Sequence, residues 1–177
     1  MKIVKLLLLL VVLGIGAAAT VMYSGVVNVA ADEPHSDLVY WLLEETRESS
    51  IKKAAKTIEI PDLSEPELLL TGGVDYEFMC SSCHLKPGQS ESDMSIGLYP
   101  APPNLTLSIE EHVGHEHEDD EQASRKSFWV IKHGIKASGM PAWGKTHDDE
   151  RIWAMVAFIK RLPTLTKEQY QILTAIE

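Results

Sequence analysis

Cys80, Cys83 and His84 are the residues of this 177-residue chain whose types and spacing point most directly to chemistry. They form the stretch CSSCH, and the chain contains no other cysteine. Three chemistries use such a group: a disulfide redox pair, part of a zinc site, or the covalent attachment of a haem. The sequence around these three residues indicates which of the three chemistries applies.

The first two chemistries need partners that the neighbourhood does not supply. A structural zinc site takes four ligands, so a fourth would have to come from elsewhere, such as His112, His115 or His117 in the acidic stretch at residues 110–124. A thioredoxin-like pair needs a strand leading into the first cysteine. The pattern before Cys80 is helical, and no run in the chain alternates strictly enough to predict a strand.

Haem attachment uses these residues without further assumption. It needs two thiols one helical turn apart to take up the vinyl groups, and an imidazole directly after them to bind the iron. The spacing C-x-x-C-H supplies all three groups. We therefore predict one haem c, bound covalently by Cys80 and Cys83, with His84 as an axial ligand of the iron.

The second axial position of that iron is open to a methionine, a histidine or no residue at all. Met155 falls inside an apolar helical pattern typical of a core, and Met94 comes only ten residues after His84. Met140 follows a helix stop in a loop between a glycine and a proline, and we predict that it is the ligand. The histidine candidates are His112, His115, His117, His133 and His147.

The N-terminal residues differ in character from the rest. Residues 6–27 carry no charge, and a membrane-spanning helix needs about 20 such residues. Lys2 and Lys5 before them place the N-terminus in the cytoplasm. We predict a transmembrane anchor over residues 1–31, although the small residues ending at Ala31 leave signal-peptide cleavage open. Either alternative puts residues 32–177 outside the cytoplasm.

The exported part is strongly acidic. It contains 14 Lys and Arg residues and all 26 Asp and Glu residues of the chain, a formal charge of −12. This balance argues against nucleic acid, whose phosphates require a basic surface. An acidic surface steers basic partners toward it, so a redox partner with a basic docking face is expected.

Proline, glycine and charge divide the exported part into predicted helices, which makes the domain all-α. A helical connector is expected over residues 32–65, and a second domain over residues 66–177. The predicted helices cover residues 37–58, the stretch from Pro66 to the cysteines, and residues 122–133 with a stop at Gly134. A further helix is predicted up to Arg161, with Thr146 or His147 near its start. Residues 86–105 are rich in Pro, Gly and Ser and are predicted to be loop.

Residues 72–163 resemble a class I c-type cytochrome. The motif GGVDYEFMCSSCH places Gly72, Tyr76 and Cys80 at four-residue intervals, as in the N-terminal helix of that family. The motif GMPAW is similar to its methionine loop. The motif PPNL is similar to its proline segment, which implies that the carbonyl of Pro103, with Pro102 close behind, accepts the Nδ1–H of the iron-bound histidine. Gly72 is then expected to let the N- and C-terminal helices cross closely.

The resemblance and the closed iron site together imply an electron carrier that is not an enzyme by itself. The closer similarity is to membrane-anchored monohaem cytochromes of Gram-negative bacteria, which places the haem domain on the periplasmic side of the inner membrane. The alternative is a cytochrome subunit of a larger dehydrogenase or oxidase. A haem-based sensor would need a displaceable Met140 and a signalling domain.

Overall fold

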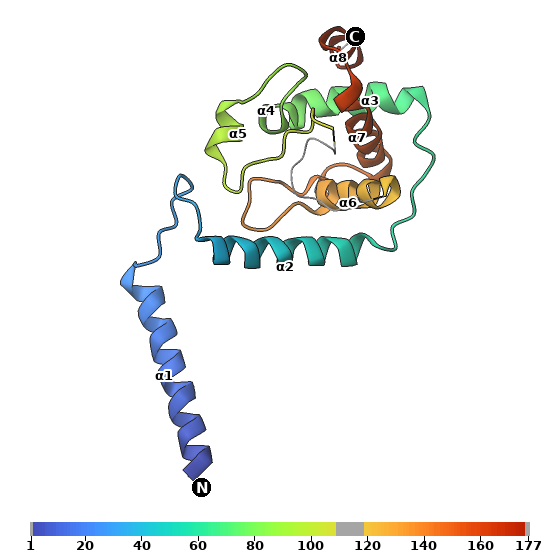
Figure 1. Ribbon diagram of the computed structural model, residues 1–177. Helices are drawn as coiled ribbons and strands as arrows, with labels where there is room; N and C mark the ends of the chain where they lie inside the picture. The colour runs from blue at the N-terminus through green and yellow to red at the C-terminus, as the bar shows by residue number, and fades with distance from the viewer. Residues whose placement is uncertain (1, 109–118, 176–177) are drawn as a thin grey trace. The chain divides into compact units, whose positions relative to one another are not determined.

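The computed structural model describes residues 2–108 and 119–175 of the chain. It divides into two compact units, Met1–Pro34 and His35–Glu177. Every regular element in the described part is helical and none is a strand, so the expected all-α fold is confirmed (Figure 1). The histidine candidates at positions 112, 115 and 117 lie outside the described residues.

The first unit contains a single helix, α1 (Lys2–Ser24). Its 23 residues are about 34 Å long at the rise of an α-helix, slightly more than the hydrocarbon core of a bilayer. No residue of α1 is buried, and among the described helices it is the one long and apolar enough to cross a membrane.

The second unit is built around the crossing of α3 (Pro66–Met79) and α7 (Asp149–Arg161). Pro66 occupies the first turn of α3, where its missing N–H costs nothing. A Cβ placed on Gly72 would lie 2.0 Å from the carbonyl oxygen of Ala154, which no side chain can tolerate. The expected close crossing at Gly72 is therefore confirmed.

Two clusters of buried side chains flank this crossing. One surrounds Ile152 and Met155 and includes the stacked rings of Phe128 and Trp153, whose centroids are 4.2 Å apart. The other contains Tyr76, Cys80, Phe158, Leu162 and Tyr170. Met79 and Ile159 pack against both clusters, so one continuous core supports the whole domain.

Helix α6 (Asp120–His133) packs against α7 and ends where the sequence predicts. Gly134 adopts a φ of 65°, a left-handed conformation that suits glycine and stops the helix. Helix α7 begins at Asp149, close to the expected Thr146 and His147. The Asp148 carboxylate caps it by accepting a hydrogen bond from the N–H of Arg151.

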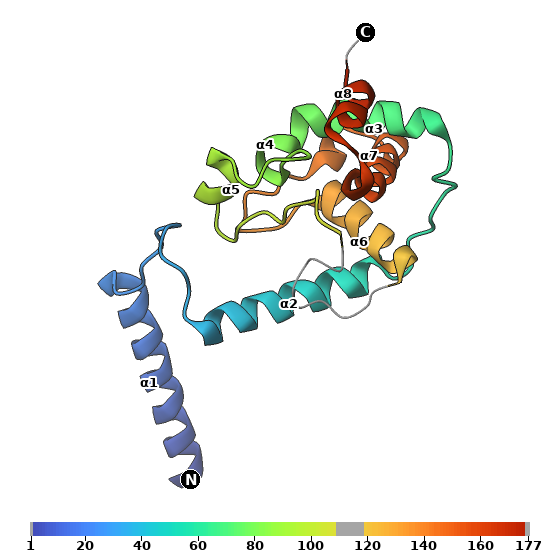
Figure 2. The same ribbon diagram turned by 45° about the horizontal axis from the view of Figure 1, so that its top comes forward.

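The C-terminal part of helix α2 (Asp37–Ala55) lies next to α6 in both views of the molecule (Figures 1 and 2). Ile51 and Ala55 near its C-terminal end are buried, and Arg125 of α6 donates a hydrogen bond to the carbonyl of Ile58. The helix ends at Ala55, three residues before the end predicted at Ile58. Helix α2 thus packs against α6 within the same compact unit.

The remaining elements are short. Residues 86–105 hold a five-residue helix that the loop prediction lacked, and Ser92 starts it through a capping box with Ser95. The C-terminal helix was also unpredicted, and Thr166 caps it through a second box with Gln169. These short elements are α4 (Ser81–His84), α5 (Asp93–Gly97), η2 (Trp143–Lys145), η3 (Leu162–Thr164) and α8 (Lys167–Leu173).

Candidate haem site

Cys80 lies at the junction of α3 and α4, so the two cysteines follow one another around a helical turn. The N–H groups of Cys83 and His84 donate to the carbonyl of Cys80 at 3.1 and 2.8 Å. The Cys80 side chain is buried and that of Cys83 is half-buried, and neither forms a disulfide. Two free thiols one turn apart, followed by an imidazole, are the donor set that covalent haem attachment requires.

The imidazole of His84 is oriented by the proline segment. Its Nδ1 lies 2.8 Å from the carbonyl oxygen of Pro103, and the carbonyl of His84 accepts a hydrogen bond from the N–H of Leu105 at 3.2 Å. Since a carbonyl only accepts, Nδ1 must carry the proton and Nε2 is left with a free lone pair. The ring can therefore bind a metal through Nε2. A hydrogen bond from the other ring nitrogen, as here to Pro103, commonly fixes the tautomer of a metal-binding histidine.

The protonation of His84 suits the same role. Burial lowers the pKa of its imidazole, and the hydrogen bond to Pro103 opposes this only in part. The neutral ring is therefore favoured at neutral pH, and neutral imidazole is the form that binds a metal ion.

Tyr76 supports the backbone directly after His84. Its hydroxyl donates to the carbonyl of Leu85 at 2.7 Å and lies 3.2 Å from the carbonyl of His84. Leu85 has a φ of 71°, an uncommon conformation for a residue with a side chain, which needs support from its surroundings. Burial raises the pKa of Tyr76, so the hydroxyl stays protonated and remains a donor. In the sequence, Tyr76 is marked only by its four-residue spacing from Gly72 and Cys80, although a buried tyrosine hydroxyl usually needs a partner.

The state of Cys80 argues against a disulfide redox pair. Burial, with smaller contributions from Asp75 and Cys83, raises the pKa of the Cys80 thiol to about 12. Redox dithiols react as thiolates and are found where the thiol pKa is lowered. Among residues 2–108 and 119–175, no group of three or more His, Cys, Asp or Glu side chains is placed to hold a metal ion.

An ion pair between a buried carboxylate and a half-exposed arginine lies near the cysteines. Asp75 on α3 is 4 % exposed, and both of its carboxylate oxygens accept hydrogen bonds of 2.5 Å from the guanidinium of Arg151 on α7. The pair therefore links the two crossing helices beside Cys80. Seventy-six positions separate its members, so sequence reasoning had no local signal for it.

Met140 lies in the loop between α6 and η2 and is partly buried against the cluster of Phe128 and Trp153. Its carbonyl accepts a hydrogen bond from the N–H of Ile135 at 3.2 Å, and its own N–H donates to the hydroxyl of Ser138 at 3.1 Å. These two bonds close the loop on itself. The loop also packs against the segment that precedes the proline motif, because a Cβ on Gly139 would lie 2.8 Å from the Leu98 side chain.

The other candidate ligands have different surroundings. Met155 is fully buried in the core, and Met94 is half exposed on α5. The ring of His133 packs against Trp129 on its own helix, with centroids 5.0 Å apart. His147 lies against Trp143, and its Nδ1 is 2.8 Å from the hydroxyl of Thr146.

Comparison with known protein families identifies a match over the haem site. A family model described as "Cytochrome C oxidase, cbb3-type, subunit III" matches residues 67–159, just over half of the chain. The matched region includes the cysteine motif, the proline segment, the Met140 loop and most of α7. No curated protein and no solved structure matches the chain.

Proposed function

The chain belongs to this family of c-type cytochromes, and from that premise we propose that it is a membrane-anchored electron carrier of a bacterial respiratory chain. Membership makes it a haem c protein that transfers electrons. The proposal adds which residues bind the haem, on which side of the membrane it lies, and that the chain passes electrons on without catalysing a reaction itself.

We propose four residues as the ligands of the haem. Cys80 and Cys83 form the thioether links, His84 binds the iron through Nε2, and Met140 binds it on the opposite face. The observation that carries this assignment is the 2.8 Å contact between His84 Nδ1 and the Pro103 carbonyl, which leaves Nε2 as the free nitrogen beside two free thiols. When bound, the haem supplies an iron that gains and loses one electron.

The two residues that bind the iron from opposite sides determine which reactions are open to the protein. His84 and Met140 together leave no coordination position for a substrate, which favours electron transfer over peroxidase or oxygen chemistry. A thioether ligand raises the reduction potential relative to a second histidine. Cys80 belongs to one of the two packed clusters, and this packing limits the rearrangement that accompanies each transfer.

The experiment for this assignment is extraction of the haem with acid acetone. Colour that stays on the protein supports thioether attachment, and a preparation that loses its haem or contains zinc overturns it. The matching test for Met140 is an absorption spectrum of the oxidised protein, which should contain the weak long-wavelength sulfur-to-iron charge-transfer band.

The membrane arrangement is supported by α1 and its flanks. The helix is long enough to span a bilayer, and the two lysines at its start favour a cytoplasmic N-terminus. We propose an uncleaved single-pass anchor at residues 1–31 in the inner membrane, a connector at residues 32–65, and a periplasmic haem domain at residues 66–177. Cell fractionation with N-terminal sequencing tests this, because a soluble form that begins at Asp32 would show cleavage.

The proposed partner is a redox protein with a basic docking face. The formal charge of −12 on residues 32–177 supports it, since opposite charges accelerate encounter. The rate of electron exchange with a basic redox protein should fall as salt is added, because ions screen the attraction. A rate that does not depend on salt would remove this part of the proposal.

A second function is favoured by the description of the matched family, which names an oxidase subunit. Under this alternative the chain is the cytochrome subunit of a larger dehydrogenase or oxidase. Native electrophoresis of mildly solubilised membranes separates the two functions. A carrier migrates alone, whereas a subunit migrates with the rest of its complex.

A further inference from the structure

Helix α2 carries an exposed apolar segment at its N-terminal end. Six consecutive residues, 38–43, are apolar, and their exposed fractions run from 42 % at Val39 to 65 % at Leu38. The segment consists of Leu38, Val39, Tyr40, Trp41, Leu42 and Leu43. A helix on the surface of a soluble domain normally has a polar outer face, so an apolar segment of this kind marks a contact surface.

Both flanks of this segment are fixed to the haem domain, so its exposure does not come from a loose chain end. Before it, the N–H of His35 donates to the hydroxyl of Tyr99 at 3.1 Å, and the two rings pack edge to face. After it, Ile51 and Ala55 are buried at the interface with α6. The segment between these two contacts is exposed to solvent, although the residues before it and after it pack against the rest of the domain.

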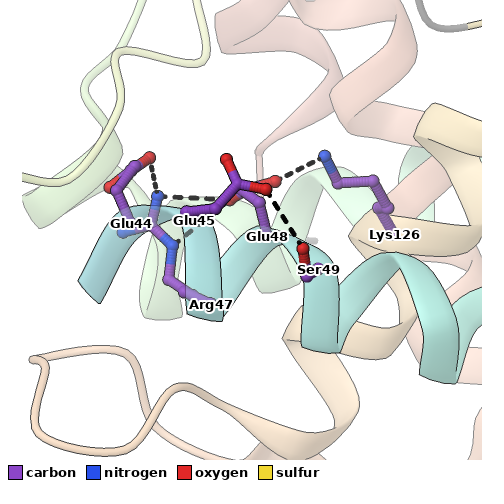
Figure 3. A network of polar contacts seen from close by, with 6 residues as sticks. All are labelled: Glu44, Glu45, Arg47, Glu48, Ser49 and Lys126. Carbon is purple, nitrogen blue, oxygen red and sulfur yellow. Dashed lines mark hydrogen bonds and ion pairs between the residues drawn. The ribbon is translucent and has the colours of Figure 1, made fainter. Parts of the chain in front are cut away.

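A polar network begins directly after the segment and links α2 to α6, as Figure 3 shows. Lys126 of α6 forms an ion pair with Glu48 at 2.8 Å. On α2, Arg47 pairs with both Glu44 and Glu48, and Ser49 donates to Glu45. The surface of α2 therefore changes from wholly apolar to charged within one helical turn.

The chain that precedes the segment limits what it can contact. Helix α1 ends at Ser24 and α2 begins at Asp37. The residues between them, 25–36, span at most about 40 Å when fully extended. Given the proposed anchor, on which this inference rests, the segment cannot move far from the outer surface of the bilayer.

We propose that residues 38–43 insert into the outer interface of the membrane and form a second lipid contact of the protein. Tyrosine and tryptophan are the side chains enriched at that depth, and Tyr40 and Trp41 stand at the centre of the segment. The aliphatic residues on either side supply the apolar area that binds a shallow helix to lipid. Because α2 is fixed to α6, this contact holds the haem domain in one orientation on the membrane.

Fluorescence quenching in vesicles tests the contact on the full-length holoprotein. With Cys80 and Cys83 in thioether links, a single added cysteine is the only free thiol and takes an environment-sensitive dye. The labelled variants are Leu42→Cys within the segment, Ser50→Cys as an exposed control on the same helix, and Val11→Cys within α1. Brominated lipids report contact with the bilayer, and iodide reports contact with water.

The proposal predicts that brominated lipid quenches the label at position 42 and that iodide does not, with the reverse at position 50. A label at position 42 that iodide quenches would overturn the proposal, and so would one that neither agent reaches, which indicates a protein contact. The label at position 11 tests the anchor separately. If brominated lipid fails to quench it, the proposed anchor itself is wrong, whereas quenching at 11 without quenching at 42 contradicts only the interfacial contact.

Discussion

The two faces of the proposed haem site are built in different ways. On one face, His84 follows the cysteines in a four-residue helix, and the Pro103 carbonyl and the Tyr76 hydroxyl hold its ring and its backbone. On the other face, Met140 lies in a loop that is closed by hydrogen bonds to Ile135 and Ser138 and that packs against the distant Leu98. We call these the histidine face and the methionine face.

The difference suggests that one face fixes the attachment of the haem and the other sets its reduction potential and its accessibility. The histidine face depends on neighbours in sequence and on covalent links, so single changes there should prevent the haem from being bound. The methionine face adds one weaker bond from a loop, so changes there should leave the haem attached but alter its potential and accessibility. The α3–α7 crossing supports both faces.

The largest effect is expected from Cys80→Ala or Cys83→Ala. Each variant removes one thioether from the histidine face, and the yield of protein with haem attached should fall close to zero, as measured by haem staining on denaturing gels. Ser82→Ala changes the exposed residue between them and should keep the normal yield. Normal staining in both cysteine variants would show that the haem is not bound through this motif.

Gly72→Ala should weaken both faces together. The added Cβ would meet the backbone carbonyl of Ala154, which cannot move without parting α3 from α7. Overpacking of this kind costs about 3 kcal/mol of the free energy of unfolding. The measurement is urea unfolding followed by haem absorbance. Gly97→Ala is the control, since nothing lies within 4 Å of its Cβ. Equal stability of both variants would contradict the close crossing.

Met140→Ala should affect the methionine face alone. The haem should stay attached, while the sulfur-to-iron band disappears, the reduction potential falls and small ligands bind quickly. Absorption spectra and a redox titration of the purified variant provide the measurement. Met94→Ala should keep the band, because the Met94 side chain is half exposed on α5. If the band persists without Met140, another residue holds the iron.

Tyr76→Phe is expected to have the smallest effect, restricted to the histidine face. It leaves the buried Leu85 carbonyl without its donor and should cost about 1–2 kcal/mol of stability. Tyr170→Phe is a matched control, because its hydroxyl donates to the Glu77 carboxylate at 2.6 Å, away from His84. Both variants should lose stability, and only Tyr76→Phe should shift the haem potential. A comparable shift in both would mean that Tyr76 has no special connection to His84.

The elements predicted correctly from the sequence depend on local signals. Pro66 starts α3, Gly134 ends α6, and the apolar run after Asp148 forms α7 between charges placed to suit its dipole. Gly72 was identifiable because its four-residue spacing from Tyr76 and Cys80 resembles a known helix. Such signals lie within a few residues of the feature that they predict.

The unpredicted features depend on contacts between distant segments. Helix α8 is short and packs through Tyr170, whose partner Glu77 lies 93 positions earlier. The packing of α2 onto α6 depends on two buried residues of α2, Ile51 and Ala55. It also depends on the ion pair between Glu48 and Lys126, which lie 78 positions apart. The two residues that cap α5 and α8 are polar and sit in loop-like sequence, where composition alone favours no helix.

The binding of carbon monoxide by the reduced full-length protein tests the central claim most directly. If His84 and Met140 both bind the iron, the absorption spectrum should stay unchanged when carbon monoxide is added at neutral pH. A rapid shift of the main haem band would show an open position on the methionine face. The closed electron-carrier site would then be wrong, and an enzymatic or gas-sensing role would take its place.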